Sequence, residues 1–304
     1  MLTTSHRIAK FCEYWGSRSK RRDEPPFLPA RLRAAQCAIE RAFPDLDALS
    51  TPIDVEALAR RRDIRGIEYR EVGGDGQISR LPGGGYVVTV NRAHSEQRRR
   101  FTIAHEIAHT LFFEALGEES EQLGMEYEEG RDPDEERICD FVAARLLLPP
   151  KQVERFLKQH SIDVSTVVSL AHEFDCSLRA AARCFLQHFP LKARVIFWEY
   201  LEKRGMFVAR WLEATEESGR AGRLRFDLRA NEPAYTDFLE RRQLWGRYWI
   251  RLDGPLDRYF VDGIAFRSTP RRLLTLIVLD EAAEMIVRSR LPTNSGDALQ
   301  ASLF

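Results

Sequence analysis

Residues 101–113 read FTIAHEIAHTLFF, and this stretch decides how the first half of the chain folds. Its apolar side chains recur at intervals of three and four residues, which is the period of an amphipathic helix. They are Phe101, Ala104, Ala108, Leu111 and Phe112. Ser95 stands just ahead of the pattern and is a suitable N-cap. We therefore predict a helix over residues 96–113.

The middle of this helix carries the motif His105-Glu106-Ile107-Ala108-His109. Residues four apart on a helix lie on the same face, about 40° apart around the axis. Both imidazoles can therefore reach one metal ion, at the roughly 2.0–2.1 Å of a zinc–nitrogen bond. Glu106 projects about 100° away. Its carboxylate is placed beside a zinc-activated water and can remove the proton of that water as a general base.

A catalytic zinc site usually has three protein ligands and one open position. Glu136 is the predicted third ligand, because it lies on a second predicted helix over residues 133–148. That helix starts with Pro133 in its first turn and stops before Pro149. The acidic segment over residues 114–132 connects the two helices and lets the second fold back across the first.

Other side chains of the second helix have expected roles as well. Asp140 lies one turn after Glu136 and is suited to accept the outer N–H of a ligating histidine. Glu135 and Asp134 are rival third ligands, although the spacing of Glu136 and Asp140 favours Glu136. Cys139 is of a zinc-binding type, but we expect it to pack as a small core residue.

The transition state and the metal leave alternatives open. An oxyanion formed on a carbonyl needs a hydrogen-bond donor besides the metal. Tyr127 and His94 are the candidates close in sequence to the two helices, and a structural role is the alternative for each. Zn²⁺ is the expected ion, whereas Mn²⁺ or Fe²⁺ also suits two histidines, one carboxylate and an open position.

Two motifs together resemble the ImmA/IrrE metallopeptidase family. Residues 102–109 read TIAHEIAH and residues 136–149 read ERICDFVAARLLLP. The usual family pattern has alanine where this chain has Cys139 and methionine where it has Leu148. The resemblance covers residues 30–190 and implies a gluzincin-like zinc peptidase. It also implies a protein substrate, a helix-turn-helix repressor, whose cleavage induces the response to radiation and DNA damage.

The composition excludes several other classes of protein. Lys and Arg number 46, as do Asp and Glu, so the net charge favours neither nucleic acid nor a membrane as partner. Five cysteines without a C-x-x-C spacing indicate reduced thiols and a cytoplasmic location. No apolar run approaches the roughly 18 residues of a membrane-spanning helix.

A chain of 304 residues predicts several domains, and the pattern of elements indicates a multidomain α+β fold. Further helices are expected over residues 30–43 and 52–62, and from Asp280-Glu281 to about residue 288. Strands are expected over residues 65–72, 86–90, 193–200, 223–229, 248–252, 259–266 and 273–279. The expected parts are a basic flexible leader (1–27), a zinc peptidase-like domain (28–155), a helix-turn-helix-like segment (156–190), a GAF-like α+β sensor domain (191–295) and a tail (296–304). The sensor assignment follows from resemblance to the deinococcal IrrE branch of the family, and it leaves room for a small-molecule signal.

Residues 165–187 support a rival function, direct regulation of transcription. They have the rhythm of a helix-turn-helix, with Asp175 in the turn, where glycine would be comfortable. Arg179, Arg183 and Gln187 are the side chains that its second helix offers to base edges. In this alternative the metal site is structural or vestigial. A purely structural helical pair explains the segment equally well.

Overall fold

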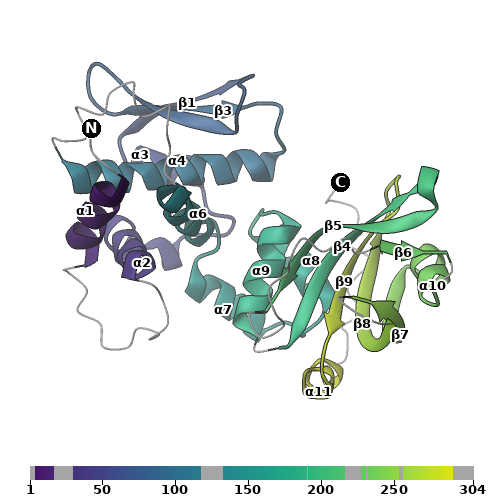
Figure 1. Cartoon of the computed structure of the whole chain (residues 1–304). Coiled ribbons are helices and arrows are strands. Elements are labelled where there is room, and N and C mark those ends of the chain that lie inside the picture. Colours follow the sequence, from purple (N-terminus) through teal and green to yellow (C-terminus); the bar gives the residue numbers. More distant parts are fainter. Residues whose placement is uncertain are drawn as a thin grey trace. The chain divides into compact units, whose positions relative to one another are not determined.

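The computed structural model describes residues 4–16, 30–117, 133–189, 191–215, 227–230, 232–252 and 256–289. The fold is α+β and divides into two compact units (Figure 1). The first comprises Met1–Gln152 with Phe174–Cys176, and the second comprises Val153–Glu173 with Ser177–Phe304. Among the described residues, no helix combines the length and apolar character that crossing a bilayer requires.

The first unit is built around one central helix, α4. Its elements are α1 (Thr4–Gly16), α2 (Ala30–Ala42), η1 (Leu46–Ala48), α3 (Val55–Arg60), β1 (Ile64–Arg70), β2 (Gly76–Arg80), β3 (Tyr86–Asn91), α4 (Glu96–Leu116) and α6 (Pro133–Leu147), with α7 (Pro150–Lys158) at its border. The three strands form a sheet in the order β1-β3-β2, in which β3 is parallel to β1 and antiparallel to β2. The sheet lies on one side of α4, and α1, α2 and α6 lie on the other (Figure 1).

Helix α4 begins and runs as its sequence predicts. The Ser95 side chain accepts a hydrogen bond from the backbone N–H of Arg98, which caps the first turn. Every residue from Thr102 to Phe112 is buried. The helix continues to Leu116, three residues beyond the predicted end, because the segment there is still packed against the core. A helix buried on all sides holds its polar side chains in a fixed position.

The expectation of a flexible leader is wrong for residues 4–16, which form α1. Arg7, Phe11 and Trp15 are four residues apart and make one buried face of this helix. The ring of Phe11 stacks on Phe112 with centroids 4.1 Å apart. Trp15 Nε1 donates to the carbonyl of Leu111 at 3.3 Å. The segment is therefore folded despite its many basic residues, because burying Phe11 and Trp15 against α4 stabilises the helix.

Strand β2 was not predicted from the sequence. It pairs with β3 from Gly76↔Val90 to Arg80↔Tyr86 and buries Ile78. A β-carbon on Gly76 would lie 2.5 Å from Thr102 Cγ2 and 2.6 Å from the carbonyl oxygen of Thr89. Glycine at this position lets the strand approach α4 closely.

The second unit is a six-stranded antiparallel sheet with helices on both faces. Its elements are α8 (Val164–Glu173), α9 (Leu178–His188), β4 (Ala193–Leu201), η3 (Glu202–Arg204), β5 (Met206–Ala214), β6 (Asp227–Arg229), α10 (Tyr235–Glu240), β7 (Gln243–Arg251), β8 (Leu256–Phe266), β9 (Arg272–Val278) and α11 (Glu281–Ser289). The strand order is β6-β5-β4-β9-β8-β7. The sequence predicted α11 and five of the strands, which are β4, β6, β7, β8 and β9. It did not predict β5 and α10.

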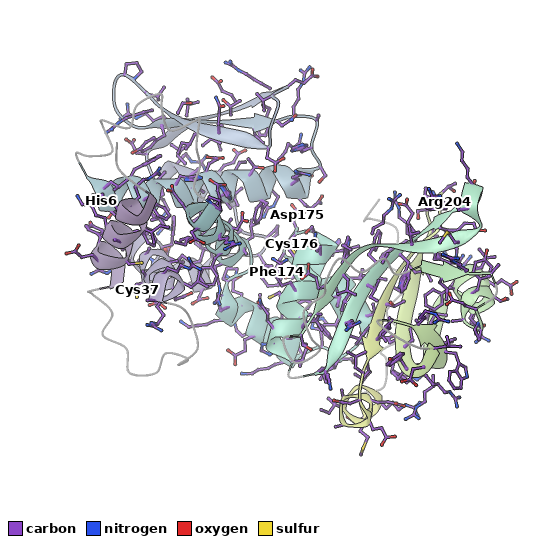
Figure 2. All side chains as sticks on the ribbon, in the orientation of Figure 1. His6, Cys37, Phe174, Asp175, Cys176 and Arg204 are labelled. Carbon is purple, nitrogen blue, oxygen red and sulfur yellow. The ribbon has the colours of Figure 1, made fainter. Side chains whose placement is uncertain are left out.

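The helical pair α8–α9 packs on this sheet. Contacts join α9 to β4 and β5, and α8 to β8 and β9. Arg179 and Arg183, the predicted base-reading side chains of α9, both bind the carboxylate of Glu213 on β5, at 2.6 and 3.1 Å. The turn residue Asp175 has the left-handed φ of 44°. Asp175 is labelled in Figure 2. Its side chain accepts one hydrogen bond from Gln97 and pairs with Arg100, each at 3.0 Å, which explains an aspartate at this position.

Candidate metal centre

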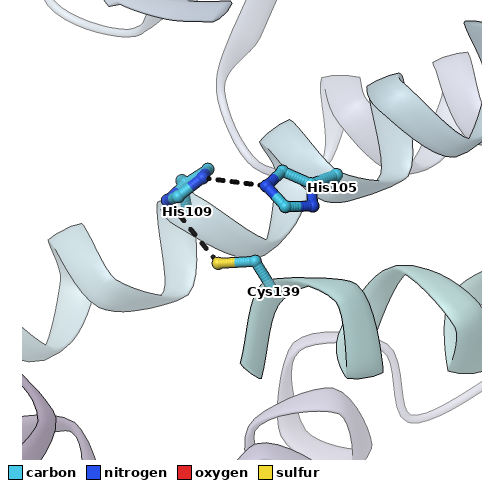
Figure 3. A group of neighbouring side chains, drawn as sticks. All are labelled: His105, His109 and Cys139. Atoms are coloured by element: carbon cyan, nitrogen blue, oxygen red, sulfur yellow. Dashed lines mark hydrogen bonds between the residues drawn. The ribbon is translucent and has the colours of Figure 1, made fainter. Parts of the chain in front are cut away.

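Helices α4 and α6 pack side by side, and the two histidines of α4 face each other at this contact. The Nε2 atoms of His105 and His109 are 3.2 Å apart (Figure 3). His109 is fully buried and His105 is 9% exposed. The four-residue spacing thus brings both imidazoles to one point, as the motif predicts.

Glu136 of α6 completes a set of three converging groups. Its Oε2 lies 3.1 Å from His105 Nε2, and its Oε1 lies 3.5 Å from His109 Nε2. Ligand atoms bound tetrahedrally at about 2.0–2.1 Å are separated by about 3.3 Å. The separations between the three groups match that value. The residues present therefore fit a zinc ion, and the 30% exposure of the Glu136 side chain leaves the centre open to solvent on one side.

Cys139 is a second candidate ligand by proximity. One donor atom each from His105, His109 and Cys139 lies within 4.8 Å of the others. The sulfur, however, is 3.5 Å from Nδ1 of His109, the ring nitrogen that faces away from His105 (Figure 3). The two Nε2 atoms converge with Glu136 on the other edge of the ring. Glu136 therefore reaches the point where the two Nε2 atoms meet, whereas the sulfur of Cys139 contacts the opposite edge of the His109 ring.

The outer nitrogen of each histidine contacts a carboxylate. Asp140 Oδ1 lies 3.0 Å from His105 Nδ1, as predicted for this residue. Glu135 Oε1 lies 3.3 Å from His109 Nδ1. Such contacts fix the tautomer and the orientation of a ligating ring. Glu135, a rival ligand in the sequence, therefore lies at the outer side of His109. The only sequence feature that hinted at this contact is its place next to Glu136.

The charges around His105 strongly favour its protonated form when no metal is bound. Burial by itself lowers the pKa of this imidazole, but hydrogen bonds to Asp140 and Glu136 and the charge of Glu106 outweigh burial. The pKa of His105 is raised from 6.5 to about 9. A metal ion must displace this proton in order to bind, so the same carboxylates that attract a cation also make binding depend on pH.

The expected base, Glu106, is 2% exposed and follows His105 on α4. Its charge contributes to the raised pKa of His105, which places it close to the centre. Tyr127 lies outside the described residues. His94 precedes the N-cap of α4, and its Nδ1 contacts Asp75 at 3.3 Å. His105 lies nine residues into α4, about 13 Å along the axis, so His94 is not brought to the centre.

A cavity of about 490 Å³ lies elsewhere in the first unit. Its walls include Tyr69, Arg99 and Ile103. Ile103 stands two residues before His105 and therefore about 200° around the helix axis. The cavity is on the opposite side of α4 from the histidines and takes no part in the centre.

Comparison with known proteins finds a family similar to the part of the chain that holds the candidate centre. Residues 49–185 match the family described as the IrrE N-terminal-like domain, peptidase M78. This range holds both histidines, Glu106 and Glu136. This part of the chain is therefore similar to the N-terminal domain of a family of metallopeptidases.

A curated relative agrees with this assignment. The radiation response metalloprotease IrrE of Deinococcus deserti is 32% identical over 99 residues, which cover 32% of this chain. The chain spans about a third (34%) of that relative's own length. A transcriptional regulator of Mycobacterium tuberculosis resembles 94% of this chain, and 99% of its own, with a TM-score of 0.46 and 14% identity. At that similarity we transfer neither fold nor function.

Proposed function

We propose that this protein is a site-specific zinc metalloendopeptidase of the gluzincin type. The observation that carries the proposal is the convergence of His105 Nε2, His109 Nε2 and the Glu136 carboxylate at separations that suit zinc. The family of the first unit supports hydrolysis of a peptide bond. A closed structural zinc site would need a fourth protein ligand, whereas three side chains of the described residues converge here beside a candidate base.

The chain's own residues have distinct roles in this proposal. His105, His109 and Glu136 would hold the ion, which supplies Lewis acidity when bound. Glu106 accepts the proton of the attacking water and passes it to the leaving nitrogen of the cleaved bond. Asp140 keeps the ring of His105 in place through Nδ1. Burial of Glu106 and both histidines keeps these side chains in fixed positions, while water reaches the centre from the side of Glu136.

The substrate class and its biological setting rest on relatives. The Deinococcus deserti relative is named a radiation response metalloprotease. We infer that this protein likewise cuts a regulatory protein, a helix-turn-helix repressor, in the cytoplasm and so induces a response to radiation or DNA damage. The six-stranded sheet of the second unit would then serve as a GAF-like sensor that takes a small-molecule signal.

Direct DNA binding through residues 165–187 is less well supported than proteolysis. Arg179 and Arg183 are both engaged by Glu213 of their own unit. A base-reading helix needs such side chains directed at base edges. The helical pair therefore has a packing role that explains its sequence.

The test is cleavage of a co-expressed helix-turn-helix repressor by the wild type and by Glu106→Ala, with bound metal measured in both. We expect Glu106→Ala to retain its metal and to lose about 10²–10⁴-fold in cleavage rate. Glu96→Ala, which removes an exposed carboxylate from the same helix, is the control and should cleave normally. Equal cleavage by wild type and Glu106→Ala would refute the assigned base, and a wild type that cleaves no repressor would refute the protease.

A further inference from the structure

Glu135 differs from the other outer carboxylate of the centre in its surroundings. The side chain of Asp140 is 60% exposed, so water can solvate its charge. The side chain of Glu135 is 2% exposed and contacts the fully buried His109. A buried carboxylate needs a charged partner or several hydrogen bonds to remain ionised and correctly oriented.

That partner comes from the N-terminal helix. Arg7 of α1 reaches across 128 residues of sequence, and its Nη2 lies 2.7 Å from each carboxylate oxygen of Glu135. The Arg7 side chain is itself only 11% exposed. Helix α1 is held against α4 by Phe11 and Trp15, on the same face as Arg7. The guanidinium is therefore presented to Glu135 by a packed helix.

We propose that Arg7 is a positioning residue of the metal centre, acting through Glu135 on His109. The contacts run from Arg7 Nη2 to Glu135 at 2.7 Å and from Glu135 Oε1 to His109 Nδ1 at 3.3 Å. By donating to Oε1 and pairing with the carboxylate charge of Glu135, Arg7 holds the acceptor that orients the imidazole, so that Nε2 points to His105 and Glu136. The N-terminal helix is thus part of the metal site. This inference rests on the proposed metal-binding function.

A nearby ion pair provides a matched control. Arg31 of α2 contacts Asp134 of α6 at 2.9 Å, and their side chains are 39% and 40% exposed. This pair also joins an N-terminal helix to α6, one residue before Glu135. It contacts neither histidine. An effect of Arg7 on the metal should therefore be absent in Arg31 variants, whereas an effect on helix anchoring should be shared.

The experiment measures Zn²⁺ affinity by competition with a chromogenic chelator for the full chain. Arg7→Met keeps the apolar stem of the side chain and removes the guanidinium. We expect Arg7→Met and Glu135→Gln each to weaken Zn²⁺ binding by about 10–100-fold. The double variant should bind no more weakly than Glu135→Gln alone, because Arg7 acts through Glu135. Arg31→Met should stay within about twofold of wild type.

A second readout separates positioning from anchoring. The visible absorption of bound Co²⁺ reports the geometry of the ligand atoms, and it should change in Arg7→Met and remain unchanged in Arg31→Met. Arg7→Lys, which restores a cation, should recover part of the lost affinity. If Arg7→Met does not fold, Arg7→Lys and Glu135→Gln decide by the same criteria.

Two results would overturn the inference in different ways. Wild-type affinity and an unchanged Co²⁺ spectrum in Arg7→Met and Glu135→Gln would show that the pair only anchors α1, and the proposed protease would stand. A wild-type chain that binds no Zn²⁺ would overturn both the inference and the function on which it rests.

Discussion

At the scale of single residues, the carboxylates around His105 make its imidazole bind a proton more tightly than an isolated histidine does. Glu136, Asp140 and Glu106 all act on His105, whose pKa is about 9. The folded protein therefore binds this proton more tightly than the unfolded chain does. The interaction of protonated His105 with these carboxylates stabilises the folded protein fully below the ordinary histidine pKa of 6.5. This stabilisation is lost as the pH rises through about 9.

The first prediction concerns this titration. Urea unfolding of the metal-stripped protein should show a free energy of unfolding that falls steadily between pH 6.5 and about 9. His105→Asn removes the titrating group, so the fall should be reduced in that variant. A stability that rises over this range in the wild type would contradict the assigned charge balance.

The identities of these residues could be read from the sequence, but not all of their roles. The motif at His105–His109 and the spacing of Glu136 and Asp140 predict contacts that the structure contains. The direction in which Glu135 points could not be predicted, because it depends on how α6 is rotated against α4. The partner Arg7 is 128 residues away in sequence, and no local pattern links the two.

At the scale of elements, strongly periodic segments were predicted well and weakly patterned ones were not. Helix α4 has a cap and a continuous apolar face. Strand β2 buries a single residue, Ile78, so it carries little alternation. In α1 the signal was present as Arg7, Phe11 and Trp15 at four-residue spacing, but the surrounding basic residues pointed to a solvated segment.

The second prediction tests whether α1 belongs to the core. Phe11 is fully buried on the ring of Phe112. Phe11→Ala should lower the free energy of unfolding by about 3–5 kcal/mol, the usual cost of deleting a buried ring. Glu13→Ala, on the exposed side of the same helix, is the control and should change it little. Equal stability of both variants would mean that α1 is detached in solution.

The third prediction concerns the junction of β8 with α8. Asp262 accepts a hydrogen bond from the backbone N–H of Val164 at 2.6 Å. Burial raises the pKa of Asp262 from 3.8 to about 7, with the neighbouring charge of Asp163 adding to the effect. A raised folded-state pKa means that stability is greatest below about 4 and falls as the pH rises through about 7.

Asp262→Asn retains an acceptor for Val164 and removes the titration. The wild type should therefore lose stability between pH 4 and about 7 in a step that the variant lacks, as followed by tryptophan fluorescence during urea unfolding. Asp257→Asn, on the exposed part of the same strand, should behave as wild type. Identical pH profiles for wild type and Asp262→Asn would refute the assignment.

At the scale of the whole molecule, the chain combines a unit that holds the candidate metal centre with a sheet unit that the sequence describes only in outline. Short β-rich runs in the sequence of the second unit predicted most of its strands. Strand β5 was missed because charged residues such as Arg210 and Glu213 interrupt its apolar pattern. Those charges are satisfied by Glu199 of β4 and by Arg179 and Arg183 of α9, which only the folded arrangement shows.

The fourth prediction follows from the charge of the chain. Its formal net charge is zero, and Arg179 and Arg183 are engaged by Glu213. We expect a gel shift with duplex DNA to show no salt-dependent complex at moderate protein concentration, because the positive charges of the chain are balanced by an equal number of carboxylates and those of α9 are already paired. A tight complex lost in Arg179→Ala and Arg183→Ala would instead support the DNA-binding alternative.

The most direct test of the metal centre is the amount of Zn²⁺ that remains bound per chain after dialysis in wild type, Glu136→Gln and Cys139→Ser. The converging Nε2 atoms and the Glu136 carboxylate predict one ion in the wild type and in Cys139→Ser, and a loss of bound ion in Glu136→Gln. Retention in Glu136→Gln together with loss in Cys139→Ser would contradict the account and would assign the third ligand to the thiolate.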